Sequence, residues 1–520
     1  MKSANGWFGL ACAGVLALAA TGSATAAAIQ GKGDVAAAYA PLGPLGVGGN
    51  DYDYDPSFAA GGIYGDRFAG PSSYYEARKI LRLGDGSVVA AGVVVFDGAY
   101  QLGLVRYSPS GRREAWPQVD AGYSHYNGEY VVFPNAANVD PKIVGVAGIK
   151  AYHGNLYVLA TQSYRADSGL DKYQPVIVVF GQTGQYRGWW FIRPDDDVYN
   201  GAIAMDMSSN GRLTLLGANS AGGLYTRFWT ARFKMDANDL PDLDESFGNG
   251  GASMFELPSS VSGCADAALG GNCPISGVDL KHEAGVIVHV DPAFYVAFTK
   301  KYNTSGDHDP CVAAFGGGGQ PLTSFNGAGI GCYPFDDTGG NHDDEAVALD
   351  TDVHQSGGFP PVYIQDIYVL ASVSRQYSSG TGLLRLDADG NAVGQFGGSG
   401  KVLWGGCGSG CSVNLGNDIP LAFARGGANL GVVGHWKPDL VDQPELSIVD
   451  ALDGTIRNFE VHAIASGDAN YNDVVADSLG FTATGWARDG AAGSNNKMFV
   501  TAHLIPSRIA DDTIFRYGTE

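Results

Sequence analysis

The chain has 520 residues, a length that suits several ordinary domains or one large repeat fold. Its formal net charge is -22, and an acidic surface repels phosphate backbones, so the composition argues against nucleic-acid binding. Glycine supplies 77 residues, about twice its usual share. Together with abundant Tyr, Phe and Val, and without long amphipathic helical stripes, this composition favours an all-β fold of short strands and tight turns.

Residues 1–26 have the features of a secretory signal peptide. Lys2 supplies a positive start, residues 7–20 form an uncharged apolar run, and Ala24-Thr25-Ala26 is a cleavage pattern. The run is short for a membrane-spanning helix, although a retained N-terminal anchor is the alternative. We expect a secreted, periplasmic or cell-surface protein that is cleaved near Ala26. A flexible Ala/Gly-rich linker over residues 27–50 would follow, with no transmembrane segment.

A short apolar strand recurs at intervals of about fifty to eighty residues along the rest of the chain. The copies are residues 87–92, 156–161, 213–218, 294–299, 367–372, 430–435 and 480–485. Glycine turns such as Asp85-Gly86 precede several copies, and two further strands follow each of them. The unit then closes on an aromatic residue: Trp116, Trp189, Phe247, Phe325, Phe396 or Phe459. A four-stranded unit of this kind cannot bury both faces alone, so neighbouring copies must stack.

These repeats predict a single β-propeller over residues 51–520, with seven four-stranded blades. Six or eight blades, or a β-sandwich or solenoid array, are the alternatives. Two segments compete for the outer strand of the last blade, Asp55-Pro-Ser-Phe58 and Asp512-Thr-Ile-Phe515. Because propellers commonly close with an N-terminal strand, we expect residues 54–64 to lie beside residues 498–504. The tail from Ala510 would then lie outside the blade.

Three segments carry a resemblance to a known family. The stretch Leu243-Asp-Glu-Ser-Phe-Gly-Asn-Gly-Gly251 resembles the signature of the delta-60 repeat, a propeller-type repeat of secreted and surface bacterial proteins. Residues 55–62 and 396–400 are further versions of it. The resemblance implies an architecture and no common activity, so it assigns no catalytic residues. Residues 451–455 resemble, once only, the blade repeat of quinoprotein dehydrogenases.

Six cysteines remain once Cys12 leaves with the signal peptide. An even number in an oxidising compartment indicates disulfides, with fifteen formal pairings. The spacing favours three local pairs: Cys264–Cys273, Cys311–Cys332 and Cys407–Cys411. A metal site is the competing interpretation of the last pair, but no second ligand pair of zinc-finger type stands nearby.

Four acids form the candidate site. Aligning the copies places Glu76, Glu345, Asp418 and Asp473 just before the innermost strand, where the second and third copies have glycine. In a propeller such positions surround one mouth of the central channel, so the acids could bind a cation or orient a polar ligand. Calcium is the candidate cofactor, and replacing Asp418 and Asp473 by alanine should then abolish stabilisation by the metal. The alternative is that each acid caps a backbone amide at the start of its own strand.

The sequence contains none of the common catalytic signatures. There is no G-x-S-x-G elbow, no phosphate-binding loop, and His282-Glu283 lacks the second histidine of a zincin. We therefore favour a secreted, non-enzymatic binding or scaffold propeller for an unknown extracellular ligand or protein, with no catalytic residues assigned. Its recognition surface would be the insertions at residues 258–274, 302–332 and 350–366.

A secreted propeller enzyme is the alternative function. It would be a carbohydrate-directed hydrolase or lyase, or a quinone-cofactor dehydrogenase. Trp116, Trp189 and Trp190 could stack on sugars, but aromatic residues on a repeated outer strand more often pack between blades. A deep pocket lined by converging polar residues would favour the enzyme, whereas a shallow, loop-lined face would favour binding.

Overall fold

The structure is a computed structural model. It describes residues 52–59, 63–66, 75–96, 99–120, 124–125, 130–133, 142–165, 171–192, 199–208, 210–221, 224–256, 275–279, 294–301, 308–335, 343–355, 363–375, 378–405, 417–437, 441–462, 468–488 and 497–506. The predicted signal peptide and linker, and the predicted pairs Cys264–Cys273 and Cys407–Cys411, lie outside the described residues. Among the described residues, no helix is long and apolar enough to cross a membrane.

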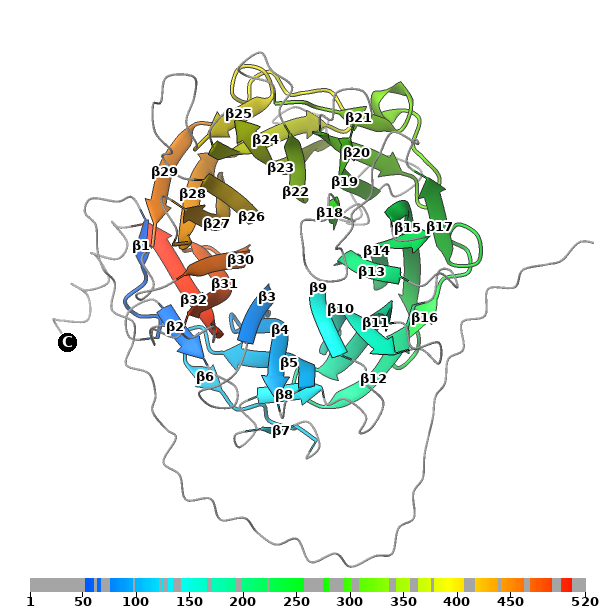
Figure 1. The fold of residues 1–520 in the computed structure, drawn as a ribbon, viewed down its shortest axis with the longest axis vertical. Helices are drawn as coiled ribbons and strands as arrows, with labels where there is room; N and C mark the ends of the chain where they lie inside the picture. The colour runs from blue at the N-terminus through cyan, green and yellow to red at the C-terminus, as the bar shows by residue number, and fades with distance from the viewer. Residues whose placement is uncertain are drawn as a thin grey trace, which may run out of the picture.

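Seven four-stranded antiparallel blades form a ring, with the first strand of each blade nearest the ring axis (Figure 1). The predicted seven-bladed propeller is therefore confirmed. Blade 1 contains β3 (Tyr75–Arg82), β4 (Val88–Phe96) and β5 (Ala99–Tyr107), with β6 (Arg113–Glu114), β7 (Ser124–His125) and β8 (Tyr130–Phe133) at its edge. Blade 2 contains β9 (Lys142–Tyr152), β10 (Asn155–Arg165), β11 (Asp171–Gly181) and β12 (Tyr186–Phe191).

The next three blades follow the same order from the ring axis outward. Blade 3 contains β13 (Tyr199–Met207), β14 (Arg212–Ala221) and β15 (Leu224–Met235), with β16 (Pro241–Leu243) and β17 (Ala252–Glu256) both paired to β15. Blade 4 contains β18 (Ile275–Asp279), β19 (Phe294–Lys301), β20 (His308–Phe315), the 3-10 turn η3 (Phe325–Gly327) and β21 (Ile330–Cys332). Blade 5 contains β22 (Asp344–Gln355), β23 (Tyr363–Arg375), β24 (Ser378–Asp387) and β25 (Lys401–Trp404).

The last two blades complete the ring. Blade 6 contains β26 (Asn417–Gly426), β27 (Asn429–Lys437), β28 (Gln443–Asp450) and β29 (Ile456–Val461). Blade 7 contains β30 (Ala469–Ala476), β31 (Phe481–Arg488) and β32 (Lys497–Pro506), with β1 (Tyr52–Tyr54) and β2 (Ile63–Asp66) paired to β32.

The core lies between the blades. The apolar runs found by sequence are second strands, and both of their faces are buried because a blade packs on either side. In blade 2, for example, Leu156 and Val158 pack toward blade 1, whereas Tyr157 and Leu159 pack toward blade 3. The hydrophobic clusters of the described residues follow this pattern, each joining two neighbouring blades.

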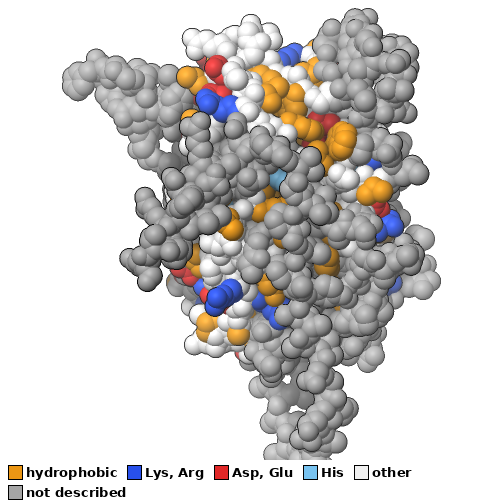
Figure 2. Space-filling model, turned by 90° about the vertical axis from the view of Figure 1, so that its left-hand side faces the viewer, with side chains coloured by type: hydrophobic (Ala, Val, Ile, Leu, Met, Phe, Trp, Pro, Cys, Tyr) orange, Lys and Arg blue, Asp and Glu red, His pale blue; other side chains and the backbone are white. Residues whose placement is uncertain are grey.

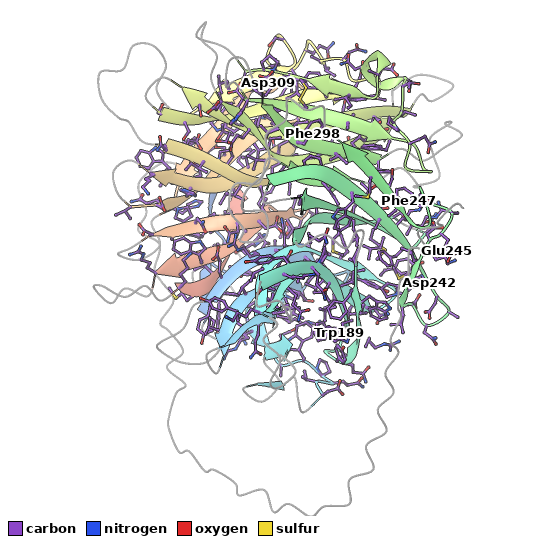
Figure 3. The ribbon with its side chains drawn as sticks, turned by 45° about the vertical axis from the view of Figure 1, so that its right-hand side comes forward. Trp189, Asp242, Glu245, Phe247, Phe298 and Asp309 are labelled. Atoms are coloured by element: carbon purple, nitrogen blue, oxygen red, sulfur yellow. A yellow bond between two sulfur atoms is a disulfide. The ribbon has the colours of Figure 1, made fainter. Side chains whose placement is uncertain are left out.

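A repeated contact, here called the inter-blade latch, ties the outer segment of several blades to the next blade. Phe247 is fully buried, and its ring packs on Gly319 in the turn between the third and fourth strands of blade 4 (Figure 3). Gly319 has φ +82°, and a Cβ added there would lie 3.0 Å from the Phe247 ring. The N–H of Gly248 also donates to the carbonyl of Gly318 at 2.9 Å. Any larger residue at Gly319 would therefore be strained and crowded.

The same latch occurs at four other seams of the described structure. The pairs are Phe58 on Gly111, Trp116 on Gly184, Phe325 on Gly390 and Phe396 on Gly454, each with a backbone hydrogen bond beside the ring. Two of the aromatic residues predicted for the fourth element, Trp189 and Phe459, do lie on the outer strands β12 and β29, but they do not form this contact. Trp189 and Phe459 are 39% and 40% exposed, since their side chains lie on the outward face of β12 and β29.

The N-terminal segment closes the ring, as predicted. In β1, Tyr54 pairs with Leu504, and in β2, Ile63 pairs with Ala502, so both strands add to the edge of β32. Phe58 then forms the latch with Gly111 of blade 1. Figure 2 views the side of the ring that contains β1 and β29, and apolar and charged side chains are mixed in the part of the wall visible there. The competing segment around Phe515 lies outside the described residues.

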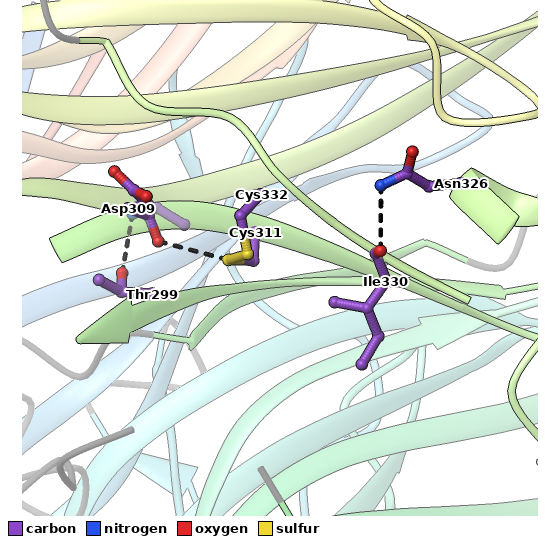
Figure 4. Close-up of a disulfide and its surroundings, with 7 residues drawn as sticks. Thr299, Asp309, Cys311, Asn326, Ile330 and Cys332 are labelled. Carbon is purple, nitrogen blue, oxygen red and sulfur yellow. Dashed lines mark hydrogen bonds between the residues drawn. A yellow bond between two sulfur atoms is a disulfide. The ribbon is translucent and has the colours of Figure 1, made fainter. Parts of the chain in front are cut away.

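One predicted disulfide is present. Cys311 on β20 lies directly opposite Cys332 on β21, and the two sulfur atoms are bonded (Figure 4). The bond links the third and fourth strands of blade 4 across 21 residues of chain. It is consistent with folding in an oxidising compartment.

Protein purified from an oxidising compartment should contain three disulfides. Reduction should then add the mass of six hydrogens, because the predicted pairing includes all six mature cysteines. Intact-mass analysis with alkylation, before and after reduction, checks this count. Free thiols at all six positions would contradict the structure as well as the two pairs predicted outside it.

Candidate functional site

The two faces of the ring differ in their connections. In an antiparallel blade, the first and third turns lie on one face, and the other connections lie on the opposite face. Most turns on the first face, the turn face, are tight, with left-handed glycines such as Gly86 (φ +84°) and Gly390 (φ +84°). Blades 4 and 5 have longer first connections. The opposite face, the loop face, contains the strand ends at which the chain leaves one blade and enters the next, such as the end of β17 and the start of β18.

The segments expected to form the recognition surface are distributed differently. Residues 302–332 are not an insertion, because they include β20, η3 and β21 of blade 4. Residues 350–366 include the ends of β22 and β23, whose pairing extends to Gln355 opposite Tyr363 on the turn face. The third segment, residues 258–274, lies outside the described residues.

Two of the predicted acids, Glu76 and Glu345, occupy equivalent places on the inner strands β3 and β22. Each directly precedes the alanine at the β-bulge of its strand. Each also faces a basic side chain from the third strand of the preceding blade. Lys497 Nζ donates to Glu76 Oε2 at 3.4 Å, and His308 Nδ1 lies 3.8 Å from Glu345 Oε1. The two acids therefore connect neighbouring blades.

The surroundings of these pairs differ in charge. Lys497 Nζ lies 3.6 Å from the centroid of the Trp486 ring, and burial lowers the pKa of its ammonium although Glu76 opposes this shift. Burial raises the pKa of Glu345, with a further contribution from Asp343, while His308 lowers it. Burial therefore disfavours the charged forms of Lys497 and Glu345, which lie at the loop-face ends of these seams.

Asp418 and Asp473 stand at different positions along their strands, counted from the β-bulge, than Glu76 and Glu345 do. Asp418 stands two residues before the residue at the bulge of β26, and Asp473 follows the bulge of β30. A shift of one residue along a strand turns a side chain to the opposite face. The four acids are therefore not one equivalent ring of side chains.

Each of these two acids has its own partner in a neighbouring blade. Thr381 Oγ1 of blade 5 donates to Asp418 Oδ1 at 2.9 Å. The N–H of Ile80 in blade 1 donates to Asp473 Oδ2 at 2.9 Å. Asp473 thus caps a backbone amide, as the alternative interpretation held, but the amide belongs to the next blade and not to its own strand.

Metal ligation was the predicted role of the four acids. Within the part of the chain that is described, no group of three or more His, Cys, Asp or Glu side chains is arranged to hold a metal ion. Calcium at Glu76, Glu345, Asp418 and Asp473 stays a prediction, and the contacts above give each acid a structural role.

Sequence reasoning missed Glu445, the partner of Asp418. Glu445 lies on β28, is 1% exposed and interacts with the Asp418 side chain. Two buried carboxyl groups that interact repel each other when both are ionised, so a proton on one of them is favoured. Burial raises the pKa of Glu445 well above its usual range, and Asp418 raises it further. A single acid between Pro444 and Leu446 in an otherwise buried strand was the available signal.

Replacing Glu445 by glutamine should stabilise the protein at alkaline pH. Because the folded pKa is raised, the folded state binds more protons than the unfolded state once the pH exceeds about 4.3, the usual pKa of glutamate. Wild-type stability should then fall by about 1.4 kcal/mol per pH unit as the pH rises toward the folded pKa. Urea unfolding from pH 5 to pH 9 should show a flatter profile for Glu445→Gln. The exposed Glu245→Gln variant is the control, and parallel profiles for wild type and Glu445→Gln would contradict the shared proton.

Among the described residues, the outer strands carry three of the exposed large aromatic side chains, Trp189, Phe191 and Phe459, and Tyr100 of β5 is a fourth. Trp189 and Phe191 of β12 contact each other edge to face, with ring centroids 4.4 Å apart. Trp116 is buried in its latch, and Trp190 packs against the cluster between blades 2 and 3. Of the three tryptophans considered for sugar stacking, Trp189 alone is substantially exposed.

Comparison with known proteins adds little beyond the fold class. No protein family model matches the chain, and no curated protein matches it. Drosophila Semaphorin 1a, extracellular domains 1-2, is similar at 9% identity with a TM-score of 0.40, covering 84% of this chain and 87% of that one. The WD40 domain of SCAP from fission yeast is similar at 5% identity with a TM-score of 0.35, covering 83% and 96%. These similarities are too low to transfer any property to this chain.

Proposed function

We propose that the protein is a secreted, non-enzymatic binding or scaffold propeller of the delta-60 repeat type, and that its ligand binds on the loop face. The contrast between the two faces supports this proposal. The turn face consists largely of tight turns, whereas the long links between blades emerge on the loop face. Binding residues are disproportionately found on loops that a rigid scaffold positions.

The contacts of the predicted acids also support a scaffold. Glu76 and Asp473 join blade 1 to blade 7, Glu345 joins blade 5 to blade 4, and Asp418 joins blade 6 to blade 5. Side chains that hold the ring together are not available to act on a substrate without loosening it. The disulfide supports secretion, because such bonds persist in oxidising compartments.

Thermal stabilisation by defined probes tests the proposal. The probes are calcium chloride, a set of oligosaccharides and pyrroloquinoline quinone, because a ligand that binds the folded state raises the unfolding temperature. Two variants locate the site. In one, a short Gly-Ser linker replaces residues 489–496 on the loop face; in the other, Leu479→Ser changes an exposed residue of the turn face.

The proposal predicts stabilisation that is lost with the loop-face variant and kept with Leu479→Ser, without conversion of the probe. The opposite dependence would place the ligand on the turn face and overturn the proposal. Turnover of an oligosaccharide, or quinone-dependent oxidation of a substrate, would establish the enzyme instead.

A further inference from the structure

A histidine in the last blade occupies a place that arginine fills elsewhere. In blade 3, the carbonyl of Arg232 accepts a hydrogen bond from Asp244, where the chain turns toward its outer strand. In blade 5, the carbonyl of Arg385 accepts the equivalent bond. In blade 7, the carbonyl of His503 accepts it from the N–H of Asp55 in the N-terminal segment. The backbone hydrogen bonds therefore place these three side chains at one position of the repeat.

Each of the three side chains is paired with carboxylate. Arg232 Nε donates to Asp244 Oδ2 at 2.8 Å, and Arg385 Nη2 donates to Asp366 Oδ2 at 2.8 Å. His503 Nδ1 lies 2.8 Å from an oxygen of its carboxylate partner. Arginine keeps its charge at every pH the fold meets, whereas histidine loses its charge near neutrality. The blade that closes the ring is thus the one with a titratable cation at this position.

The surroundings of His503 require a charged ring. The side chain is 6% exposed, with Nδ1 2.8 Å from Asp55 Oδ2 and Nε2 3.1 Å from Asp477 Oδ2. Asp477 also forms an ion pair with Arg82 of blade 1, and Arg82 donates to Thr482, the cross-strand neighbour of His503. A neutral imidazole has one N–H and can serve only one carboxylate. Loss of the proton therefore leaves the other carboxylate facing a nitrogen lone pair in a buried site.

We propose that His503 is a pH-sensitive switch on ring closure, which strengthens the hold of blade 7 on the N-terminal segment when protonated and weakens its hold on β1 and β2 when neutral. Asp55 is the only one of the charged groups around His503 that the N-terminal segment contributes. Asp477 and Arg82 stay with blades 7 and 1 whether or not that segment is bound. Loss of the proton removes the attraction between the charged ring and Asp55 in either tautomer, so it weakens the contact that the closing segment makes.

The direction of the pH dependence follows from the charges around the ring. Burial lowers the pKa of His503, but hydrogen bonds to Asp477 and Asp55 outweigh burial and raise it above its usual value. Closure is then fully stabilised below about pH 6.5, the usual pKa of histidine, and weakens as the pH rises through the higher folded value. The pKa values of Asp55 and Asp477 are lowered, despite burial, chiefly by His503, so acid weakens closure only when these carboxylates protonate.

Hydrogen exchange of residues 52–66 and 497–506, corrected for intrinsic rates and measured from pH 5 to pH 9, tests whether His503 controls closure. In the wild type, opening of the N-terminal segment should increase about ten-fold per pH unit between the two pKa values of His503. His503→Arg, which restores the side chain of blades 3 and 5, should show no such increase. His503→Gln should open more often than the wild type at acid pH, to an extent that does not change with pH. The control is His153→Gln, which changes an exposed histidine and should follow the wild type.

If exchange of residues 52–66 in the wild type does not change with pH, or if His503→Gln shows the same pH dependence, the proposed switch is overturned. If His503→Arg fails to fold, the wild type and His503→Gln still decide, because protection of residues 52–66 must depend on pH in the first and not in the second. An increase in exchange across all blades together would show global unfolding and would also overturn it.

Discussion

A chain that begins at Ile63 should be less stable than one that retains residues 52–62 by several kcal/mol, on the order of 5. The deletion removes β1 from the edge of β32 and removes Phe58 from its latch on Gly111. It also takes away Asp55, which leaves His503 buried without one of its two carboxylates. Loss of a buried aromatic side chain alone costs about 3–5 kcal/mol, and an uncovered strand edge adds to it.

Urea unfolding measures this difference. The matched control is a chain that lacks residues 511–520, which should lose less than about 1 kcal/mol, the usual size of a change away from packed features. Equal losses for the two truncations, or a larger loss for the C-terminal one, would mean that the tail closes the last blade.

Replacing Phe247 by alanine should have the second large effect. Its ring is fully buried between blades 3 and 4, beside the guanidinium of Arg232, which lies 4.7 Å from the ring centroid. Truncation leaves a cavity over Gly319 and removes the cation–π contact, so we expect a loss of about 3–5 kcal/mol.

Phe459 provides the matched control. The sequence aligns it with Phe247, but the structure leaves its side chain 40% exposed on β29. Phe459→Ala should therefore cost less than about 1 kcal/mol. Similar midpoints for the two variants in urea would show that the latch does not carry the stability assigned to it.

The strand pattern was readable because its causes are local. Second strands such as β10 and β23 are buried on both faces, so they are continuous apolar runs bounded by turn residues. The motif Asp-x-Ser-Phe is also local: Asp55 accepts a hydrogen bond from the N–H of Ser57, and Asp244 accepts one from Ser246, before the aromatic latch. The same motif marked residues 55–58 as a candidate closing segment, but Asp512-Thr-Ile-Phe515 has similar spacing, so the choice between them depended on how propellers commonly close.

The candidate site was predicted less well because its determinants are not local. Alignment on apolar runs cannot show where a β-bulge falls, so Asp418 and Asp473 were placed level with Glu76 and Glu345 when they are not. The partners of these acids come from neighbouring blades. Glu445 belongs to the same blade as Asp418 but is distant in sequence, and nothing in the strand pattern pairs the two.

The exposed aromatics show the same limit. Phe459 and Phe247 look alike in sequence, but only Phe247 is followed by the Gly-Asn-Gly-Gly turn that lets the ring reach the next blade. In β12, an alternating pattern places Trp189 and Phe191 outward and Trp190 inward, a choice that depends on register and not on composition.

A cysteine pair at residues 65 and 500 tests the closure of the ring most directly. Cys311 and Cys332 form a disulfide between the third and fourth strands of blade 4, and Val500 and Gly65 are the corresponding opposed residues of β32 and β2. If the N-terminal segment is the outer strand of blade 7, Gly65→Cys with Val500→Cys should form a disulfide on folding. Peptide mapping should identify the 65–500 link, and the oxidised protein should unfold at a higher temperature than the reduced one. If the two cysteines remain free in the oxidised, folded protein, β2 does not lie beside β32, and the N-terminal segment does not close the ring.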